Sequence, residues 1–383
     1  MMSRLLKGTA LAAVAALFLA GGAGAETIKI GMNAPQTGFA AADGKAAVIG
    51  AQLAVEQANA EGGVNGNQIE LVVYDDQAAP KQAVPIATKL IEQDKVAVGI
   101  SGSYSGATRA AAGVYQAAGV PFIAAYAVHP DVTRSGDFVF RTAVVGEVQG
   151  RAGAMLAGKM LGKKRAVVIT LKNDFGVSLS AGFKEKAADY GITVVNEYEY
   201  SIKDRQFGPI VTKVKVDNPD VIYATGYFFT AGPLVSQLRA GGVDATVIGQ
   251  EGYDSEKFIT IAKDAAEGVI ITTSLDRDST VPETKTFIAE FEKKAGFAAD
   301  MVAASGHTAA KVAIAALRKA GSTDPKAVRD AIAATNVTAA IGDISFNSLG
   351  EVRKNVQVQI VKGGAFHRHS VISDPDLLAP PEK

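Results

Sequence analysis

The chain has 383 residues, of which 48% are hydrophobic and 20% charged, with 39 basic and 39 acidic side chains and no cysteine. Balanced charge without a basic run argues against nucleic acid as a partner, because nucleic-acid binding needs clustered Lys and Arg side chains to displace phosphate counterions. The lack of cysteine excludes disulfides, thiolate metal sites, thiol nucleophiles and a lipidated amino-terminal cysteine.

Residues 1–25 have the pattern of an export leader. Arg4 and Lys7 give a basic start, residues 11–20 are apolar, and Ala23-Gly24-Ala25 forms a small-residue cleavage site. The alternative, a core helix, fits the basic start and the small-residue exit less well. We therefore expect cleavage after Ala25 and export to a periplasm. No later apolar stretch approaches the roughly 20 residues of a membrane span, so we expect no membrane insertion.

The remaining chain begins with alternating strands and helices. Strands are expected at residues 27–31, 68–74, 96–100 and 121–125, and helices at 41–60, 81–93 and 107–118. This alternation is typical of a parallel sheet covered by helices on both faces.

The same rhythm starts again after an extended segment at 138–142 and a helix at 146–161. Strands are expected at 166–170, 192–197, 220–225, 246–249 and 268–273, and helices at 176–190, 207–216 and 231–240. A second α/β sheet of similar size is therefore predicted, which agrees with a length that suggests about two domains.

The carboxyl-terminal part complicates a simple two-domain order. Helical patterns at 283–294, 301–320 and 325–334 lead to strands near 344–346 and at 356–361. Helices this amphipathic must cover existing sheet faces, and no Gly/Ser-rich linker separates the two halves. We therefore expect the chain to cross between two lobes more than once and to form a hinge.

The loop before residue 107 is a candidate anion site. Ligands of open α/β sheets bind beyond the carboxyl ends of the strands. Ser105 is a suitable N-cap, and the amides of Gly106, Ala107 and Thr108 would then point at an anion such as a carboxylate. The alternative is an ordinary capped helix, because serine caps are common.

Other motifs give no catalytic or cofactor signal. Gly99, Gly102 and Gly106 have the wrong spacing for a dinucleotide loop, the P-loop pattern and G-x-S-x-G are absent, and the four histidines form no catalytic or metal-binding set. His367 and His369 are expected to be solvated in a tail. We expect no cofactor, no metal and no enzymatic activity.

An ordered set of short segments resembles one known family. The segments are Ile28-Lys29-Ile30-Gly31, Thr37-Gly38, Glu61-Gly62-Gly63-Val64-Asn65-Gly66, Tyr74-Asp75-Asp76, Pro80-Lys81-Gln82-Ala83, Ser105-Gly106-Ala107-Thr108, Phe140-Arg141-Thr142, Asn173-Asp174-Phe175-Gly176 and Asp264-Ala265-Ala266-Glu267-Gly268. Together they resemble the periplasmic leucine/isoleucine/valine-binding proteins, the receptors of branched-chain amino acid ABC transporters, over essentially the whole mature chain.

The resemblance implies a type I periplasmic-binding fold, with two doubly wound α/β lobes, a three-crossover hinge and ligand capture by closure. Lobe 1 would comprise residues 26–143 and 274–350, and lobe 2 residues 144–273 and 351–383. The implied partners are a small-molecule ligand and the membrane permease of an ABC transporter, with the receptor itself a monomer.

The resemblance also implies a set of site residues. Ser105 would hold the α-carboxylate of an amino acid, helped by the loop Tyr126-Ala127-Val128, in which Val128 replaces the family's threonine. Phe175 and Tyr227 would be aromatic contacts from lobe 2. Glu251 would pair with the α-ammonium; the alternative for Glu251 is an ordinary surface loop residue.

Three further positions depart from the family pattern. Asp43 replaces an aromatic wall of the side-chain pocket, although an N-cap role for Asp43 is an alternative, and His307 stands where tyrosine is frequent. Tyr104 replaces a cysteine that often forms a disulfide, so the binding loop is expected to be held by packing alone. The expected ligand is an amino acid or a similar molecule; the alternative is an aromatic carboxylate, a urea or a short amide.

Overall fold

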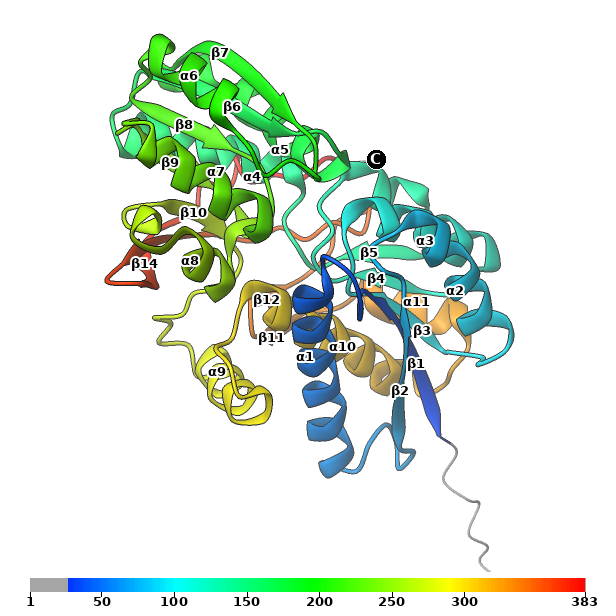
Figure 1. Ribbon diagram of the computed structural model, residues 1–383. Helices are drawn as coiled ribbons and strands as arrows, with labels where there is room; N and C mark the ends of the chain where they lie inside the picture. The colour runs from blue at the N-terminus through cyan, green and yellow to red at the C-terminus, as the bar shows by residue number, and fades with distance from the viewer. Residues whose placement is uncertain (1–26, 383) are drawn as a thin grey trace, which may run out of the picture.

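The computed structural model describes residues 27–382, which form two α/β lobes, each built on its own open sheet (Figure 1). The leader predicted for residues 1–25 lies outside the described residues. Among residues 27–382, no helix combines the length and the hydrophobicity that a membrane span requires.

The first sheet has the strand order β2-β1-β3-β4-β5, and its pairs are all parallel. Its strands are β1 (Ile28–Ala34), β2 (Ile69–Asp75), β3 (Val98–Ser101), β4 (Phe122–Ala124) and β5 (Val139–Arg141). The helices of this lobe are α1 (Ala41–Ala60), α2 (Pro80–Glu92), α3 (Ser105–Ala118), α9 (Pro282–Ala295), α10 (Met301–Ala320) and α11 (Pro325–Ala333). The central strands β3 and β4 are wholly buried, as strands covered on both faces must be.

Small residues bring the amino-terminal helix α1 and the late helix α10 together. A Cβ atom on Gly50 would lie 2.1 Å from the carbonyl oxygen of Ala303, and one on Gly306 would lie 2.3 Å from that of Ala47. Only glycine permits this approach from either side. The late helices therefore return to the first lobe, and the expected repeated crossing is confirmed.

The second sheet has the order β14-β13-β10-β9-β8-β6-β7. Its strands are β6 (Arg165–Leu171), β7 (Thr193–Tyr200), β8 (Val221–Ala224), β9 (Thr246–Gly249), β10 (Ile270–Thr273), β13 (Val356–Lys362) and β14 (Ala365–Ile372), with α4 (Gly146–Met155), α5 (Asp174–Ala187), α6 (Gly208–Asp217), α7 (Phe228–Ala240) and α8 (Glu256–Ala262) around them. The strands β6 to β10 are parallel, and β13 and β14 add an antiparallel hairpin at one edge. The chain passes between the lobes after β5, after β10 and before β13 (Figure 1).

Several local predictions were wrong. The strand β14 was not expected, and it contains His367 and His369, which were assigned to a solvated tail. Its residues are mostly exposed, so an edge strand with polar side chains looks like a tail in the sequence. The helix expected at 146–161 is α-helical to Met155 and continues as a π-helical turn. The strand expected near 344–346 is β12 (Gly342–Ile344), which pairs with β11 (Val337–Ala339) in a separate two-stranded sheet.

Candidate functional site

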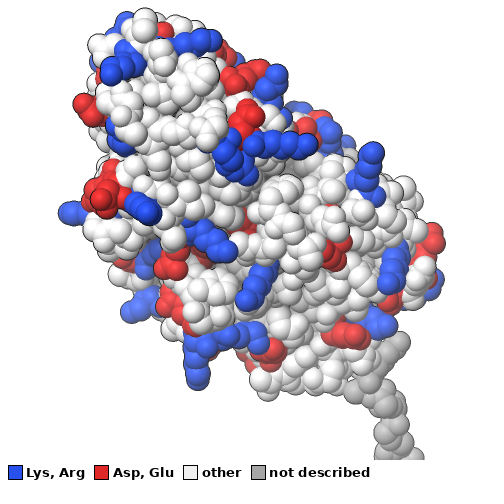
Figure 2. Space-filling view, viewed as in Figure 1, with Lys and Arg blue, Asp and Glu red and all other residues white. Residues whose placement is uncertain are grey.

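A small cavity of about 20 Å³ lies between the two lobes. It is lined by Asp43, Tyr104, Ser105, Tyr126, Phe175, Tyr227, Glu251, Gly252, Asp254, Ser255, Met301 and Val302. Most of these residues follow the carboxyl ends of parallel strands, where ligands of such sheets bind. No Lys or Arg side chain is among the lining residues, and on the face of the molecule seen in Figure 2 basic and acidic residues are interspersed over both lobes.

The amino terminus of α3 supplies hydrogen-bond donors to one end of this cavity. The helix begins at Ser105 with Tyr104 as its N-cap, so Ser105 is the first helical residue and the predicted N-cap role was wrong. The Thr108 amide donates to the Tyr104 carbonyl at 2.9 Å, which leaves the amides of Ser105, Gly106 and Ala107 as those without an intrahelical acceptor. The Ser105 Oγ accepts from the Val128 amide at 3.2 Å, so its own hydrogen is free to donate to an anion.

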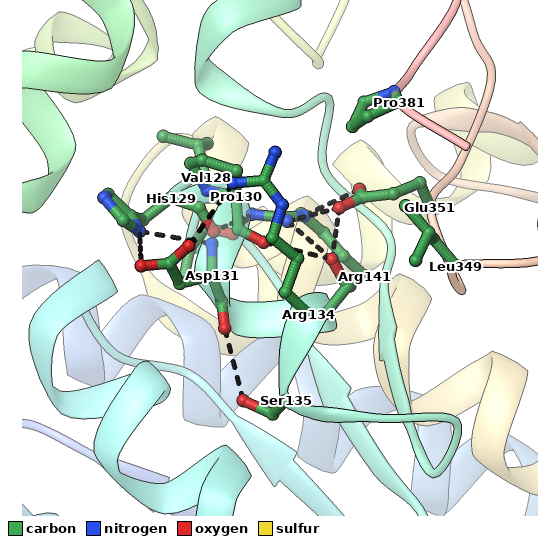
Figure 3. Close-up of polar contacts among 12 residues, drawn as sticks. Val128, His129, Pro130, Asp131, Arg134, Ser135, Arg141, Leu349, Glu351 and Pro381 are labelled. Carbon is green, nitrogen blue, oxygen red and sulfur yellow. Dashed lines mark hydrogen bonds and ion pairs between the residues drawn. The ribbon is translucent and has the colours of Figure 1, made fainter. Parts of the chain in front are cut away.

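A buried ion pair holds the loop that follows β4 (Figure 3). The Arg141 guanidinium donates to the carbonyls of Ala127 at 2.9 Å and His129 at 2.8 Å, and its Nε donates to Glu351 at 2.9 Å. Thr133 donates to the same carboxylate at 2.5 Å. Arg141 and Glu351 are both fully buried. The ion pair therefore fixes the loop after β4. The loop at Tyr104, which was expected to be held by packing alone, is also held by hydrogen bonds, because the Tyr104 hydroxyl donates to Asp43 at 2.6 Å and the Tyr126 hydroxyl donates to the Gly102 carbonyl at 2.6 Å.

Aromatic rings from both lobes stack across the cavity. The Tyr104 ring of the first lobe lies on the Tyr227 ring of the second, with centroids 4.0 Å apart and planes 5° apart. Phe175 stacks on the other side of this pair, 4.7 Å from Tyr227. Tyr126 is close to Tyr104, and its hydroxyl donates to the Gly102 carbonyl at 2.6 Å. The lobes therefore touch each other, and the arrangement is a closed one.

Asp43 lies at the side of the cavity formed by α1. The helix begins at Ala41, so Asp43 is in its first turn and the alternative of an N-cap role is wrong. The Tyr104 hydroxyl donates to Oδ2 of Asp43 at 2.6 Å. Burial raises the pKa of Asp43 to about 6, although the Tyr104 hydrogen bond and the charge of Lys257 lower it.

Glu251 follows β9 and is only 2% exposed. Gln149 on α4, which the sequence did not indicate, donates from Nε2 to Oε2 of Glu251 at 3.0 Å. Oε1 is buried and has no hydrogen-bond partner among the described residues. Burial raises the pKa of Glu251 to about 8, against the opposing effects of Gln149 and of the Lys354 charge. A donor or cation inside the cavity would satisfy this atom.

The cavity brings together seven of the ten predicted site residues: Asp43, Tyr104, Ser105, Tyr126, Phe175, Tyr227 and Glu251. Ala127 and Val128 lie behind it, where the Val128 amide contacts Ser105. His307 does not line it; its Nε2 is 2.9 Å from the Gln57 side chain, and burial lowers its pKa to about 3. Within residues 27–382, no three His, Asp or Glu side chains are grouped to hold a metal.

The sequence missed Gly252, Asp254, Ser255, Met301 and Val302 as lining residues. Asp254 and Ser255 follow Glu251 closely in the chain, and proximity to Glu251 was the signal that was available for them. Met301 and Val302 begin α10, whose return to the first lobe brings them to the cavity.

Two α/β lobes with three connections and a cavity between them define a type I periplasmic binding protein. The family model described as "Periplasmic binding protein" matches residues 27–365. A leucine-, isoleucine-, valine-, threonine- and alanine-binding protein of Pseudomonas aeruginosa is 31% identical over 355 residues, which are 92% of this chain and 93% of that protein. The chain therefore belongs to the Leu/Ile/Val-binding proteins of the periplasmic binding protein family.

Solved structures agree with this assignment. The leucine-binding protein of Thermotoga maritima has a TM-score of 0.85 at 30% identity, with 91% of this chain and 99% of that chain covered. A solute-binding protein of an ABC transporter from R. palustris, solved with benzoate, has a TM-score of 0.82 at 25% identity, with 90% of this chain and 96% of that chain covered.

Proposed function

We propose that this chain is the substrate-binding receptor of an ABC importer and encloses an amino acid, or a closely similar solute, between its lobes. The observation that carries the proposal is the unpartnered Oε1 of Glu251 in a cavity lined, among the described residues, by no basic side chain. A buried carboxylate needs a cation or a strong donor, and the α-ammonium of an amino acid is both.

The opposite charge of the ligand would lie at the amino terminus of α3. The Ser105 hydroxyl and the amides at the start of the helix offer donors to the α-carboxylate, and the helix dipole favours an anion there. Phe175 and Tyr227 would enclose the head group from the second lobe. The two charges of a zwitterion thus have separate partners, one on each lobe.

The surroundings of this function are also proposals. We place the receptor in the periplasm after cleavage behind Ala25, as a monomer that delivers its ligand to a membrane permease. The lobe boundaries are 143/144, 273/274 and 350/351, close to the three crossings of the chain. We propose that the protein is not an enzyme, because the cavity residues include no recognisable pairing of a nucleophile with a base.

An aromatic carboxylate is the second candidate ligand. The stack of Tyr104, Tyr227 and Phe175 offers flat apolar surfaces, and the R. palustris relative was solved with benzoate. With a pKa of about 8, a protonated Glu251 would donate a hydrogen bond to such a ligand. The amino acid explains Glu251 without requiring this proton, so we place it first.

Native mass spectrometry of the mature protein, followed by thermal unfolding with leucine, threonine, alanine or benzoate, tests both candidates. A ligand at ~1,000 times its Kd adds about 4 kcal/mol to the unfolding free energy, which is easily measured. Stabilisation by an amino acid supports the proposal. Stabilisation by benzoate alone would transfer it to the second candidate, and no response to any of the four would contradict it.

A further inference from the structure

Besides Glu251, two further carboxyl groups line the cavity, those of Asp43 and Asp254. Asp43 lines the same cavity as Glu251 and is 5% exposed. Among the described residues, its hydrogen-bond partner is the Tyr104 hydroxyl, which donates to Oδ2 at 2.6 Å. Oε1 of Glu251 is buried without a partner among residues 27–382, and no hydrogen bond is made to Oδ1 of Asp43 within the same residues, so a ligand could donate to either atom.

The nearby cations do not satisfy Asp43. The Arg277 guanidinium donates to Asp254 and to Gln359, and Thr273 donates to the other oxygen of Asp254 at 2.5 Å. Lys257 is exposed on α8 and acts on Asp43 through its charge without a hydrogen bond. Asp300 adds negative charge nearby and uses one oxygen to cap α10, accepting from the Ala303 amide at 2.8 Å. Asp43 can therefore accept a hydrogen bond from a ligand, and no Lys or Arg side chain lines the cavity to donate one.

Tyr104 links the two ends of the site. Its backbone caps α3 directly before Ser105, and its hydroxyl holds Asp43. The length of the Tyr104 side chain therefore separates Asp43 from the position proposed for the α-carboxylate. A short ligand side chain that extends from the α-carbon along the Tyr104 ring would end beside Asp43.

We propose that Asp43 is a specificity-determining residue that accepts a hydrogen bond from the side chain of the ligand. The receptor would accordingly prefer amino acids whose side chain has a hydroxyl or amide donor over aliphatic amino acids of the same shape. This inference rests on the proposed function and names the substrate class within it. An aliphatic side chain beside Asp43 would displace water from Oδ1 and offer no hydrogen bond in return, whereas a donor would satisfy this atom.

Two pairs of ligands with nearly equal shape test the preference: threonine against valine, and asparagine against leucine. We expect calorimetry on the intact mature protein to give at least about tenfold tighter binding of the donor-bearing member of at least one pair. Equal or weaker binding of both donor-bearing members would overturn the inference while leaving the proposed function intact. Failure of all four ligands to bind would instead contradict the proposed function.

The substitution Asp43→Leu tests whether Asp43 is the cause. Leucine is close to aspartate in size but has no acceptor for a ligand donor, so the preference should fall to about twofold or reverse. Glu256→Gln is the matched control, because Glu256 is an exposed acid on α8 and does not line this cavity; it should keep the preference. If Asp43→Leu does not fold, Asp43→Ala serves instead, because it also removes both carboxyl oxygens. Persistence of the preference in either variant would overturn the role of Asp43.

Discussion

The substitution Glu251→Gln has two opposite expected effects. It removes the carboxylate that would pair with the ligand ammonium, and it also removes an acid that is costly to bury. The new amide side chain would keep the contact with Gln149, because its oxygen can still accept from Nε2, which lies 3.0 Å from the carboxylate in the native protein. The shape of the closed cavity is therefore preserved while the charge is lost.

Both magnitudes follow from the structure. Loss of one partner of a buried charge pair in an interface costs about 2–5 kcal/mol, so amino acid affinity should fall at least about 30-fold. In the closed structure burial raises the pKa of Glu251 from its ordinary value of 4.5 to about 8, and we take Glu251 to be hydrated, with the ordinary value, in the open form. At pH 7 this requires uptake of a proton at a cost of about 3 kcal/mol. The variant avoids that cost, so its ligand-free closed population should rise relative to the open one by roughly two orders of magnitude.

Calorimetry with an amino acid ligand and small-angle X-ray scattering of the ligand-free protein measure the two effects. We expect weaker binding together with a smaller ligand-free radius of gyration. Glu256→Gln removes an exposed negative charge near the same cleft and should change neither quantity. Native-like affinity in Glu251→Gln would refute the pairing with an ammonium, and an unchanged radius of gyration would refute the calculated cost of closure.

Two further predictions concern the buried ion pair of Arg141 with Glu351 and the dependence of closure on pH. Arg141→Met should lower the unfolding free energy by about 3–5 kcal/mol, because it leaves Glu351 buried without its partner. The double variant Arg141→Met with Glu351→Leu should lose less stability. Chemical unfolding of both variants measures this difference, and equal losses would contradict the prediction. Lowering the pH from 8 to 5 should favour the closed form of the ligand-free receptor. The pKa of Glu251 is about 8 in the closed form, so closure takes up a proton and becomes more favourable as the pH falls below that value. The radius of gyration from small-angle X-ray scattering should therefore decrease as the pH falls, and no change with pH would contradict the prediction.

The two sheets were predictable from the sequence because their strands are short buried apolar runs between long helices. α1, β9 and α10 have the predicted bounds, and most other elements of the two lobes differ by a few residues. The errors fall where burial is one-sided or where the backbone changes type: the exposed edge strand β14, the short helix α8 and the π-helical turn after α4. No periodicity of buried residues marks such segments.

The site was predictable only in part. Residues directly after strand ends, such as Ser105 and Glu251, follow from topology and from the family resemblance. The side-chain pairings in the site could not be predicted in this way, because Gln149 is 102 residues from Glu251 and Asp43 is 61 residues from Tyr104. The ion pair between Arg141 and Glu351 spans 210 residues and joins the first crossing to the third. Pairings at this separation are decided by how the lobes pack, which local patterns do not encode.

The division of the site between the lobes explains why closure would depend on the ligand. The first lobe contributes donors at the start of α3 and a loop that Arg141 fixes within that lobe. The second lobe contributes Glu251, whose Oε1 has no partner among the described residues after closure. Without a ligand, closing at pH 7 costs the proton uptake of about 3 kcal/mol, which holds the closed population below about 1% if the other terms balance. An ammonium that enters with the ligand removes this cost, because it lets Glu251 stay ionised. The same buried carboxylate would thus select the ligand and prevent closure in its absence.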